Sequence, residues 1–183
     1  MTFLYLVRHG RAAAGWDDDA DPGLDDVGRA QAARAASDLA KLGPLALMTS
    51  PLRRARETAE AFERAWSTTA VVEPRVGEIA SPEGIAFGAR VPWLRAAMAG
   101  TWEALGSRYG AWRAAVIASL VARSVDTVIT SHFVAINAAI GAALGDDRVV
   151  IASLDNASVT VIEVVAGRLV LRRLGHEADT LIR

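Results

Sequence analysis

The sequence has no cysteine, a single lysine and no apolar run long enough to cross a membrane. Without cysteine, the chain cannot form disulfides, thiolate metal sites or a cysteine nucleophile. The net charge is −1, which gives no bulk attraction to nucleic acid or to an anionic membrane. The N-terminal apolar run is too short for a signal peptide. We therefore expect a cytoplasmic protein with no nucleic-acid or membrane partner, and its oligomeric state is left open.

What is present is the composition of a globular protein. The chain has 183 residues, of which 52% are apolar and 22% are charged. A chain of this size can bury roughly 70% of its unfolded surface, so a complete hydrophobic core is feasible. No repeat, linker or second composition divides the sequence, and we expect one domain over residues 1–183.

Short apolar runs alternate with helical patterns along the chain. Apolar runs predict strands over 3–7, 45–48, 71–72 and 126–129. The segments between and after them predict helices over about 26–42, 51–66, 91–98, 107–123 and 133–144. The last two runs, 158–164 and 169–174, predict a closing antiparallel hairpin. This alternation predicts a three-layer α/β sandwich, with a mainly parallel central sheet and helices on both faces.

Three of the predicted strands end in polar side chains. Arg8 and His9 follow the first strand, Ser50 the second and His132 the third. The carboxyl ends of parallel strands lie along one edge of a sheet, where α/β proteins bind ligands. Arginine binds phosphate through a planar fork, and neutral imidazole acts as a nucleophile or base near neutral pH. The sequence therefore predicts an anion site with a nucleophile, and it places His9 at an exposed strand end.

Three arginines follow Ser50, which we expect to cap the next helix with Pro51 at the first helical position. Arg53 and Arg56 each have a glutamate four residues further on, a spacing typical of surface ion pairs on a helix. Arg54 has a threonine at that spacing, and helical side chains lean toward the N-terminus of their helix. Arg54 is therefore the arginine that we expect to reach the strand ends.

Three stretches together form a specific pattern: Leu6-Val7-Arg8-His9-Gly10, Ser50-Pro51-Leu52-Arg53-Arg54-Ala55-Arg56-Glu57-Thr58-Ala59 and Thr130-Ser131-His132. This pattern resembles the histidine phosphatase superfamily, which has the phosphoglycerate-mutase-like fold. The usual first-helix pattern of that family is matched by Asp21, Leu24, Gly28 and Gln31-Ala32. The motifs occur in the expected order over nearly the whole chain.

The resemblance implies a phosphatase that hydrolyses a phosphomonoester through a phosphohistidine intermediate on His9. Arg8, Arg54 and His132 would bind the non-bridging oxygens of the phosphate and stabilise the charge of the transfer. Glu78 stands at the family's proton-donor position; it would protonate the leaving alkoxide and then help water attack the phosphoenzyme. A loop carboxylate exposed to solvent is the other reading of Glu78. The expected enzyme is an acid-type phosphatase with no cofactor and no metal.

The sequence departs from the family pattern close to the nucleophile. Ala12 stands where the family often has threonine, and Gly15 stands near its usual asparagine. Two side-chain phosphate contacts are therefore missing, or are replaced by Arg11 or by backbone amides. Phe133 follows the second histidine where glycine is common, and residues 81–84 lack the usual motif after the proton donor. These changes bear on the substrate more than on the chemistry.

Several functions remain open. A phosphoglycerate-mutase-type phosphotransferase shares this site but needs a covered pocket, and the segment between Glu78 and Asp126 is short for a cover. A short rim also suits a protein phosphohistidine phosphatase, whose partner is a phosphoprotein and not a phosphorylated small molecule. The changes near Ala12 favour a catalytically silent phosphate-binding domain, whereas the retained histidines and arginines disfavour it. Trp93 and Trp102 either line the substrate pocket or belong to the core.

Overall fold

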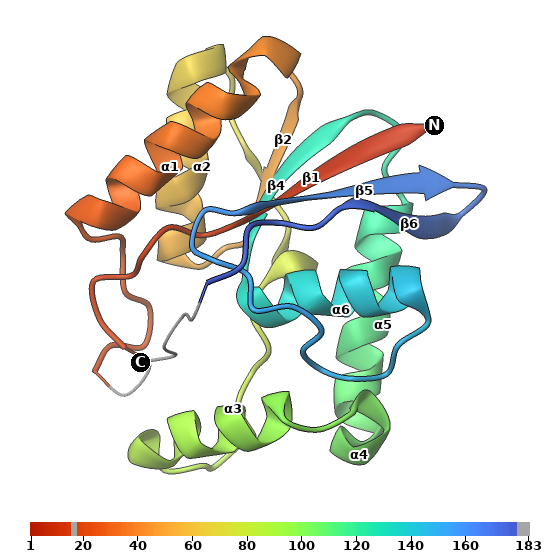
Figure 1. Cartoon of the computed structure of the whole chain (residues 1–183). Helices are drawn as coiled ribbons and strands as arrows, with labels where there is room; N and C mark the ends of the chain where they lie inside the picture. Colours follow the sequence, from red (N-terminus) through yellow and green to blue (C-terminus); the bar gives the residue numbers. More distant parts are fainter. Residues whose placement is uncertain (16–17, 179–183) are drawn as a thin grey trace.

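The computed structural model describes residues 1–15 and 18–178, and a six-stranded sheet lies at its centre (Figure 1). The strands are β1 Thr2–Arg8, β2 Ala46–Thr49, β3 Val71–Val72, β4 Thr127–Ser131, β5 Val159–Val165 and β6 Arg168–Arg173. Their order in the sheet is β3-β2-β4-β1-β5-β6. β1 to β4 run parallel, and β5 pairs antiparallel with both β1 and β6. The expected mainly parallel sheet with a closing hairpin is confirmed.

Helices cover both faces of the sheet (Figure 1). α1 Asp26–Leu39 and α2 Arg53–Trp66 lie on one face, and α5 Ser107–Val121 and α6 Phe133–Leu144 lie on the other. Two short helices, α3 Arg90–Met98 and α4 Trp102–Leu105, follow the loop after β3. Three 3₁₀ turns complete the structure: η1 Ala40–Leu42, η2 Pro74–Val76 and η3 Phe87–Ala89. The three-layer α/β sandwich is confirmed.

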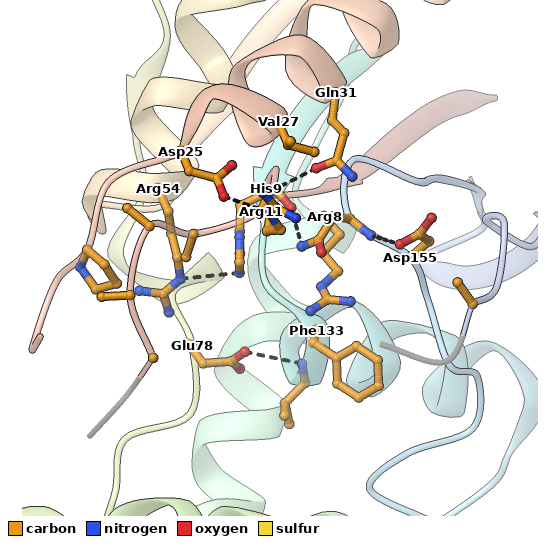
Figure 2. A pocket seen from close by; sticks show the side chains of 18 of the residues that line it. Arg8, His9, Arg11, Asp25, Val27, Gln31, Arg54, Glu78, Phe133 and Asp155 are labelled. Carbon is orange, nitrogen blue, oxygen red and sulfur yellow. Dashed lines mark hydrogen bonds and ion pairs between the residues drawn. The ribbon is translucent and has the colours of Figure 1, made fainter. Parts of the chain in front are cut away.

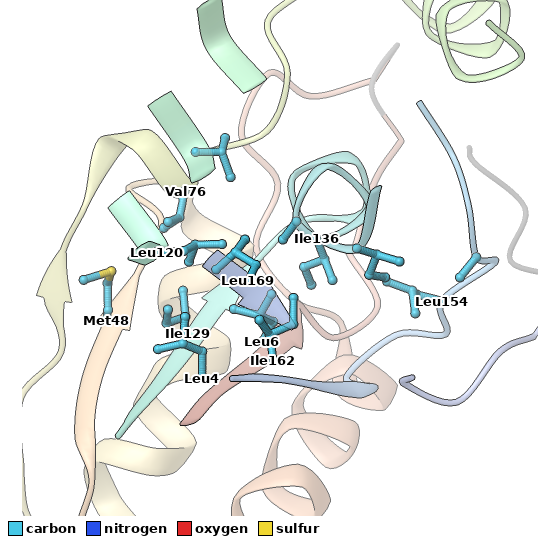
Figure 3. Close-up of a cluster of buried hydrophobic side chains, with 14 residues drawn as sticks. Leu4, Leu6, Met48, Val76, Leu120, Ile129, Ile136, Leu154, Ile162 and Leu169 are labelled. Carbon is cyan, nitrogen blue, oxygen red and sulfur yellow. The ribbon is translucent and has the colours of Figure 1, made fainter. Parts of the chain in front are cut away.

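The side chains of β1 divide between the two faces because consecutive residues of a strand point in opposite directions. Leu4 and Leu6 belong to the larger buried cluster, with Ile136 and Ile140 of α6 (Figure 3). Val7 belongs to the cluster under α1 and α2. With apolar contacts on both faces, β1 is held rigidly in the centre of the sheet, and so is the turn that follows it.

The structure corrects the expected start of α2. Leu52 is the N-cap, with φ −70° and ψ 139°, and neither Ser50 nor Pro51 belongs to the helical end as predicted. The Ser50 hydroxyl instead accepts the Leu52 N–H at 3.2 Å and lies 2.7 Å from Nε2 of His132. Serine is a common helix cap, but the Ser50 side chain instead connects the end of β2 to the end of β4 through His132.

Smaller differences concern helix ends and ion pairs. The first predicted helix continues to residue 42 only as a 3₁₀ turn after Leu39. The expected pair of Arg56 with Glu60 is not found, because Glu60 pairs with Arg64 at 3.6 Å. Within the described ranges, no helix has both the length and the apolar character needed to cross a membrane.

Candidate active site

The carboxyl ends of β1, β2 and β4 meet at a cavity of about 570 Å³ (Figure 2). Four of the five residues predicted for the site line this cavity: Arg8, His9, Arg54 and Glu78. The fifth, His132, is fully buried, and its ring centroid lies 5.2 Å from that of His9. The structure therefore brings all five residues together, from four separate segments of the chain.

His9 is buried and not exposed, which corrects the expectation from its place at a strand end. Only 8% of the residue is accessible, because Arg54 and the loop at Asn156 close around it. Nδ1 of His9 lies 2.7 Å from the Gly10 carbonyl, and Nε2 lies 3.2 Å from Nε of Arg54. A carbonyl can only accept and a guanidinium can only donate, so the proton is on Nδ1 and Nε2 carries the lone pair.

The environment of His9 keeps its imidazole neutral. Burial lowers the pKa of His9 well below its ordinary value, and the charges of Arg54 and Arg8 lower it further. The hydrogen bond to the Gly10 carbonyl acts in the opposite direction but is the weakest of these influences. His9 therefore presents an unprotonated Nε2 beside a cation, the form that an imidazole nucleophile requires.

The helix register of α2 separates the two arginines as predicted. Arg54 is 3% exposed and reaches His9, and its Nη1 lies 4.0 Å from Oδ1 of Asp21. Arg53 is on the exposed side of the helix and pairs with Glu57 at 2.7 Å. Burial lowers the pKa of Arg54, while the charges of Glu78 and Asp21 counteract that effect.

Among the described residues, one nitrogen of the Arg8 guanidinium has a hydrogen-bond partner and another has none. Its Nη1 donates to the Leu154 carbonyl at 2.5 Å, and its guanidinium lies 5.0 Å from the ring centroid of Phe133. Its Nε is buried without a hydrogen-bond partner in the described structure. Burial lowers the pKa of Arg8 to about 10, so the side chain remains a cation at neutral pH. A buried donor without a partner is costly unless a ligand supplies the acceptor.

His132 offers a second donor of this kind. The Ser50 hydroxyl accepts the Leu52 N–H, so its own proton is free to bond Nε2 of His132. Burial first, and then the charges of Arg54 and Arg8, hold the pKa of His132 well below its ordinary value. The neutral ring then carries its proton on Nδ1, which is buried without a partner in the described residues.

Glu78 faces the cavity from the loop that follows η2, and in Figure 2 its carboxylate points toward the start of α6. One oxygen accepts the Ile79 N–H at 2.9 Å, and the other lies 3.4 Å from the Val134 N–H. Burial raises the pKa of Glu78, although these two N–H groups and Arg54 act against the rise. A raised carboxyl pKa retains the proton that a general acid must deliver.

The loop after Gly10 supplies little to a phosphate. Arg11 lines the cavity, but its Nε is bound to Asp25 at 2.6 Å and its backbone N–H donates to Gln31. The backbone N–H of Ala13 donates to the Gly23 carbonyl at 2.9 Å. The expected replacement of the contacts missing at Ala12 and Gly15 therefore does not come from these two amides.

Sequence reasoning missed two residues that position His9. Asn156 donates from Nδ2 to the His9 carbonyl at 3.1 Å. Thr58 accepts the Gly10 N–H at 3.1 Å and donates to the Arg54 carbonyl at 2.7 Å, so it joins the nucleophile loop to α2. The Asp155-Asn156 pair, a turn-forming sequence just before a strand, is the signal that marks this loop.

Trp102 of the variable segment belongs to the core, and Trp93 packs against it. Trp102 is 3% exposed and stacks on Trp112, and Trp93 packs near Tyr109. The cavity is lined instead by Leu94 and Met98 of α3. In the described residues, no group of three or more His, Asp or Glu side chains has the arrangement of a metal site.

The strand order and the paired histidines define a phosphoglycerate-mutase-like α/β protein. A family model of the histidine phosphatase superfamily (branch 1) matches residues 4–177. The chain therefore belongs to the histidine phosphatase superfamily. No curated protein matches its sequence.

Solved structures share this fold at low sequence identity. A mycobacterial glucosyl-3-phosphoglycerate phosphatase in complex with VO3 aligns with a TM-score of 0.71 at 22% identity, over 94% of this chain and 97% of its own. A phosphoserine phosphatase from Entamoeba histolytica aligns with a TM-score of 0.70 at 20% identity, over 94% and 96%. A phosphoglycerate mutase from Thermus thermophilus aligns with a TM-score of 0.61 at 23% identity, over 97% and 100%.

Proposed function

We propose that the protein is a phosphatase that hydrolyses a phosphomonoester through a phosphohistidine intermediate on His9, without a metal or cofactor. The observation that carries the proposal is the neutral Nε2 of His9, held beside Arg54. Around it, Arg8 and His132 each have a buried nitrogen without a partner. A phosphate group supplies the oxygen acceptors that such donors lack.

In the proposed first step, the lone pair on Nε2 of His9 forms a bond to phosphorus, and the bond from phosphorus to the ester oxygen breaks. Before this attack, Arg54 turns its Nε from His9 to a phosphate oxygen, which frees the lone pair, and Arg8 and His132 bind the other non-bridging oxygens. Glu78 gives its proton to the departing alkoxide oxygen. In the second step, ionised Glu78 takes a proton from water, the water oxygen bonds to phosphorus, and His9 is released with inorganic phosphate.

The exposure of the described residues at the rim of the cavity favours hydrolysis over mutase-type transfer. Val27 at the rim is 44% exposed, and Ala13 and Asp18 are also exposed. A phosphoenzyme at this site would therefore meet solvent before it could recapture a released intermediate. We expect a phosphorylated small molecule as substrate, with a phosphoprotein as the second candidate, and a cytoplasmic location.

Rapid quench tests the proposal directly. With a phosphomonoester labelled in the phosphate and excess chelator present, we expect label on the protein that acid removes and base does not, as for a phosphoramidate. His9→Ala should abolish the label, whereas His132→Ala should slow labelling without abolishing it. Label that persists in His9→Ala would move the nucleophile to another residue. A folded wild type with neither label nor turnover would favour the silent phosphate-binding domain, and activity that only added metal restores would contradict the metal-free site.

A further inference from the structure

The cavity extends beyond the proposed phosphate site at His9. Its outer walls are apolar or carry carboxylates, whereas its base carries arginines. We infer that these walls select phosphomonoesters whose leaving group has an apolar surface and carries no second anion. This inference rests on the phosphatase activity proposed above. It adds the chemical class of the leaving group and the residues that select it.

One wall is apolar and fixed. Leu94 and Met98 of α3 and Phe133 and Val134 at the start of α6 line the cavity side by side with the catalytic groups. All four also belong to, or pack against, a buried hydrophobic cluster around Trp102. The wall is therefore an extension of the core into the cavity, and it cannot turn polar groups toward a substrate.

The cationic side chains that line the cavity either belong to the proposed phosphate site or are already ion-paired. Among the described residues that line it, the cations are Arg8, Arg54 and Arg11. Arg8 and Arg54 are at His9, where the transferred phosphate must bind. Arg11 is bound to Asp25 at 2.6 Å. The Gly28 N–H and then Arg11 lower the pKa of Asp25 against the opposing effect of burial. No guanidinium in this lining is left to bind a carboxylate on the leaving group.

The remaining charges of the lining are negative. Asp18 and Asp155 line the cavity, and neither forms an ion pair within the described residues. Asp155 is half-buried, and its carboxylate accepts the Asn156 N–H at 2.7 Å. The charge of Asp155 also acts on Arg8, whose pKa it raises against the larger lowering by burial. An anionic leaving group would meet these carboxylates and the apolar wall, and like charges that face each other are strongly unfavourable. A neutral or cationic leaving group avoids this cost.

The first experiment compares kcat/KM for 2-phenylethyl phosphate and for phosphoglycerate. Both have an alkoxide leaving group that requires a proton, so they differ mainly in the apolar surface and the second anion. We expect 2-phenylethyl phosphate to be at least about tenfold better. Para-nitrophenyl phosphate, with its activated leaving group, reports the basic reaction. If it is hydrolysed while phosphoglycerate is equal or better, the inference fails and the phosphatase stands; if none of the three is hydrolysed, both fail.

The second experiment changes the wall. Met98→Arg places a cation in the cavity and should raise kcat/KM for phosphoglycerate relative to 2-phenylethyl phosphate by about tenfold. Ala96→Arg is the matched control, because Ala96 is exposed on the same helix and does not line the cavity. Asp155→Asn removes a carboxylate without adding volume and should shift the ratio in the same direction. An unchanged ratio in both cavity variants would overturn the inference.

Discussion

At the residue scale, the reactivity that we propose for His9 follows from two hydrogen bonds of opposite sense. The Gly10 carbonyl requires a donor at Nδ1, and the Arg54 guanidinium requires an acceptor at Nε2. Burial and two neighbouring cations then keep the ring unprotonated. A histidine that ends a strand would be an ordinary polar residue without these partners, which come from the next residue and from α2.

Arg54 and Arg53 provide a matched pair of substitutions. Arg54→Ala should lower kcat/KM on the order of 100-fold or more, because it removes a buried donor beside the transferred phosphate. Arg53→Ala should keep turnover near wild type and cost about 0.5 kcal/mol of stability at most, since Arg53 forms only an exposed helix pair with Glu57. Steady-state kinetics and denaturant unfolding measure both effects. A crippled Arg53→Ala enzyme would show that the phosphate is bound on another side of α2.

The raised pKa of Glu78 predicts that the pH dependence of kcat/KM differs between leaving groups. Its pKa is raised, chiefly by burial, and only the protonated acid can assist an alkoxide. For an alkyl phosphate, kcat/KM should therefore fall as pH rises through the raised pKa of Glu78. The limb on the acid side should lie below the ordinary pKa of histidine, because the pKa of His9 is lowered and its neutral form is required.

The control for this profile is a substrate that needs no proton. Para-nitrophenyl phosphate should lack the alkaline limb assigned to Glu78. Glu78→Gln should retain most of the wild-type kcat/KM with that substrate and lose most of it with an alkyl phosphate, because kcat/KM reports formation of the phosphoenzyme and not its later hydrolysis. Equal losses with both substrates would assign Glu78 to phosphate binding or structure and not to proton transfer.

At the scale of elements, the loop after β1, which begins with His9 and Gly10, is held against α1 by a contact that two glycines permit. A Cβ on Gly10 would lie 2.3 Å from the Gly28 carbonyl oxygen, and a Cβ on Gly28 would lie 2.1 Å from the Arg11 carbonyl oxygen. Both clashes are with backbone, which cannot rotate away. The close backbone contact therefore fixes the loop after β1 relative to the first turn of α1. This arrangement sets the location of His9.

Gly28→Ala should destabilise the protein by about 2 kcal/mol, because the backbone must shift to admit the methyl group. It should also lower kcat, since the displaced segment carries Gly10. Gly110→Ala is the control: Gly110 lies in α5 with no heavy atom within 4 Å of the added Cβ, and the better helix propensity of alanine should leave stability equal or up to about 1 kcal/mol higher. Chemical denaturation and kcat are the measurements. A neutral Gly28→Ala would mean that the loop tolerates separation from α1.

At the scale of the molecule, two of the three buried clusters share packing residues. Trp112 and Phe133 pack against both the cluster between α5, α6 and the sheet and the cluster beneath α3 and α4. The segment that lines the outer cavity is thus not a separate unit. We propose that residues 1–183 form one cooperative domain.

Unfolding in urea should accordingly show one transition. Far-UV circular dichroism reports the helices. Tryptophan fluorescence reports two regions: Trp66 lies at the cluster under α1 and α2, and Trp93, Trp102 and Trp112 lie at the cluster beneath α3 and α4. The midpoints should coincide, as two-state unfolding requires. An earlier fluorescence transition that leaves most of the helical signal intact would show that α3 and α4 unfold separately.

The sequence alone determined the sheet, its layers and the position of the site. Unbroken apolar runs fixed the parallel strands, the glutamate spacing in α2 separated Arg53 from Arg54, and the polar strand ends located the cavity. These features are local periodicities, which the chain carries in its own order of residues.

Only the tertiary structure decided the environment of the proposed catalytic groups. The burial of His9, the use of the Ser50 hydroxyl by His132 and the support from Asn156 all join segments far apart in the sequence. The same holds for the apolar wall, to which α3 contributes Leu94 and α6 contributes Phe133. A pKa, a tautomer and the shape of a pocket depend on which distant groups exclude water from a side chain, and no local pattern specifies those groups.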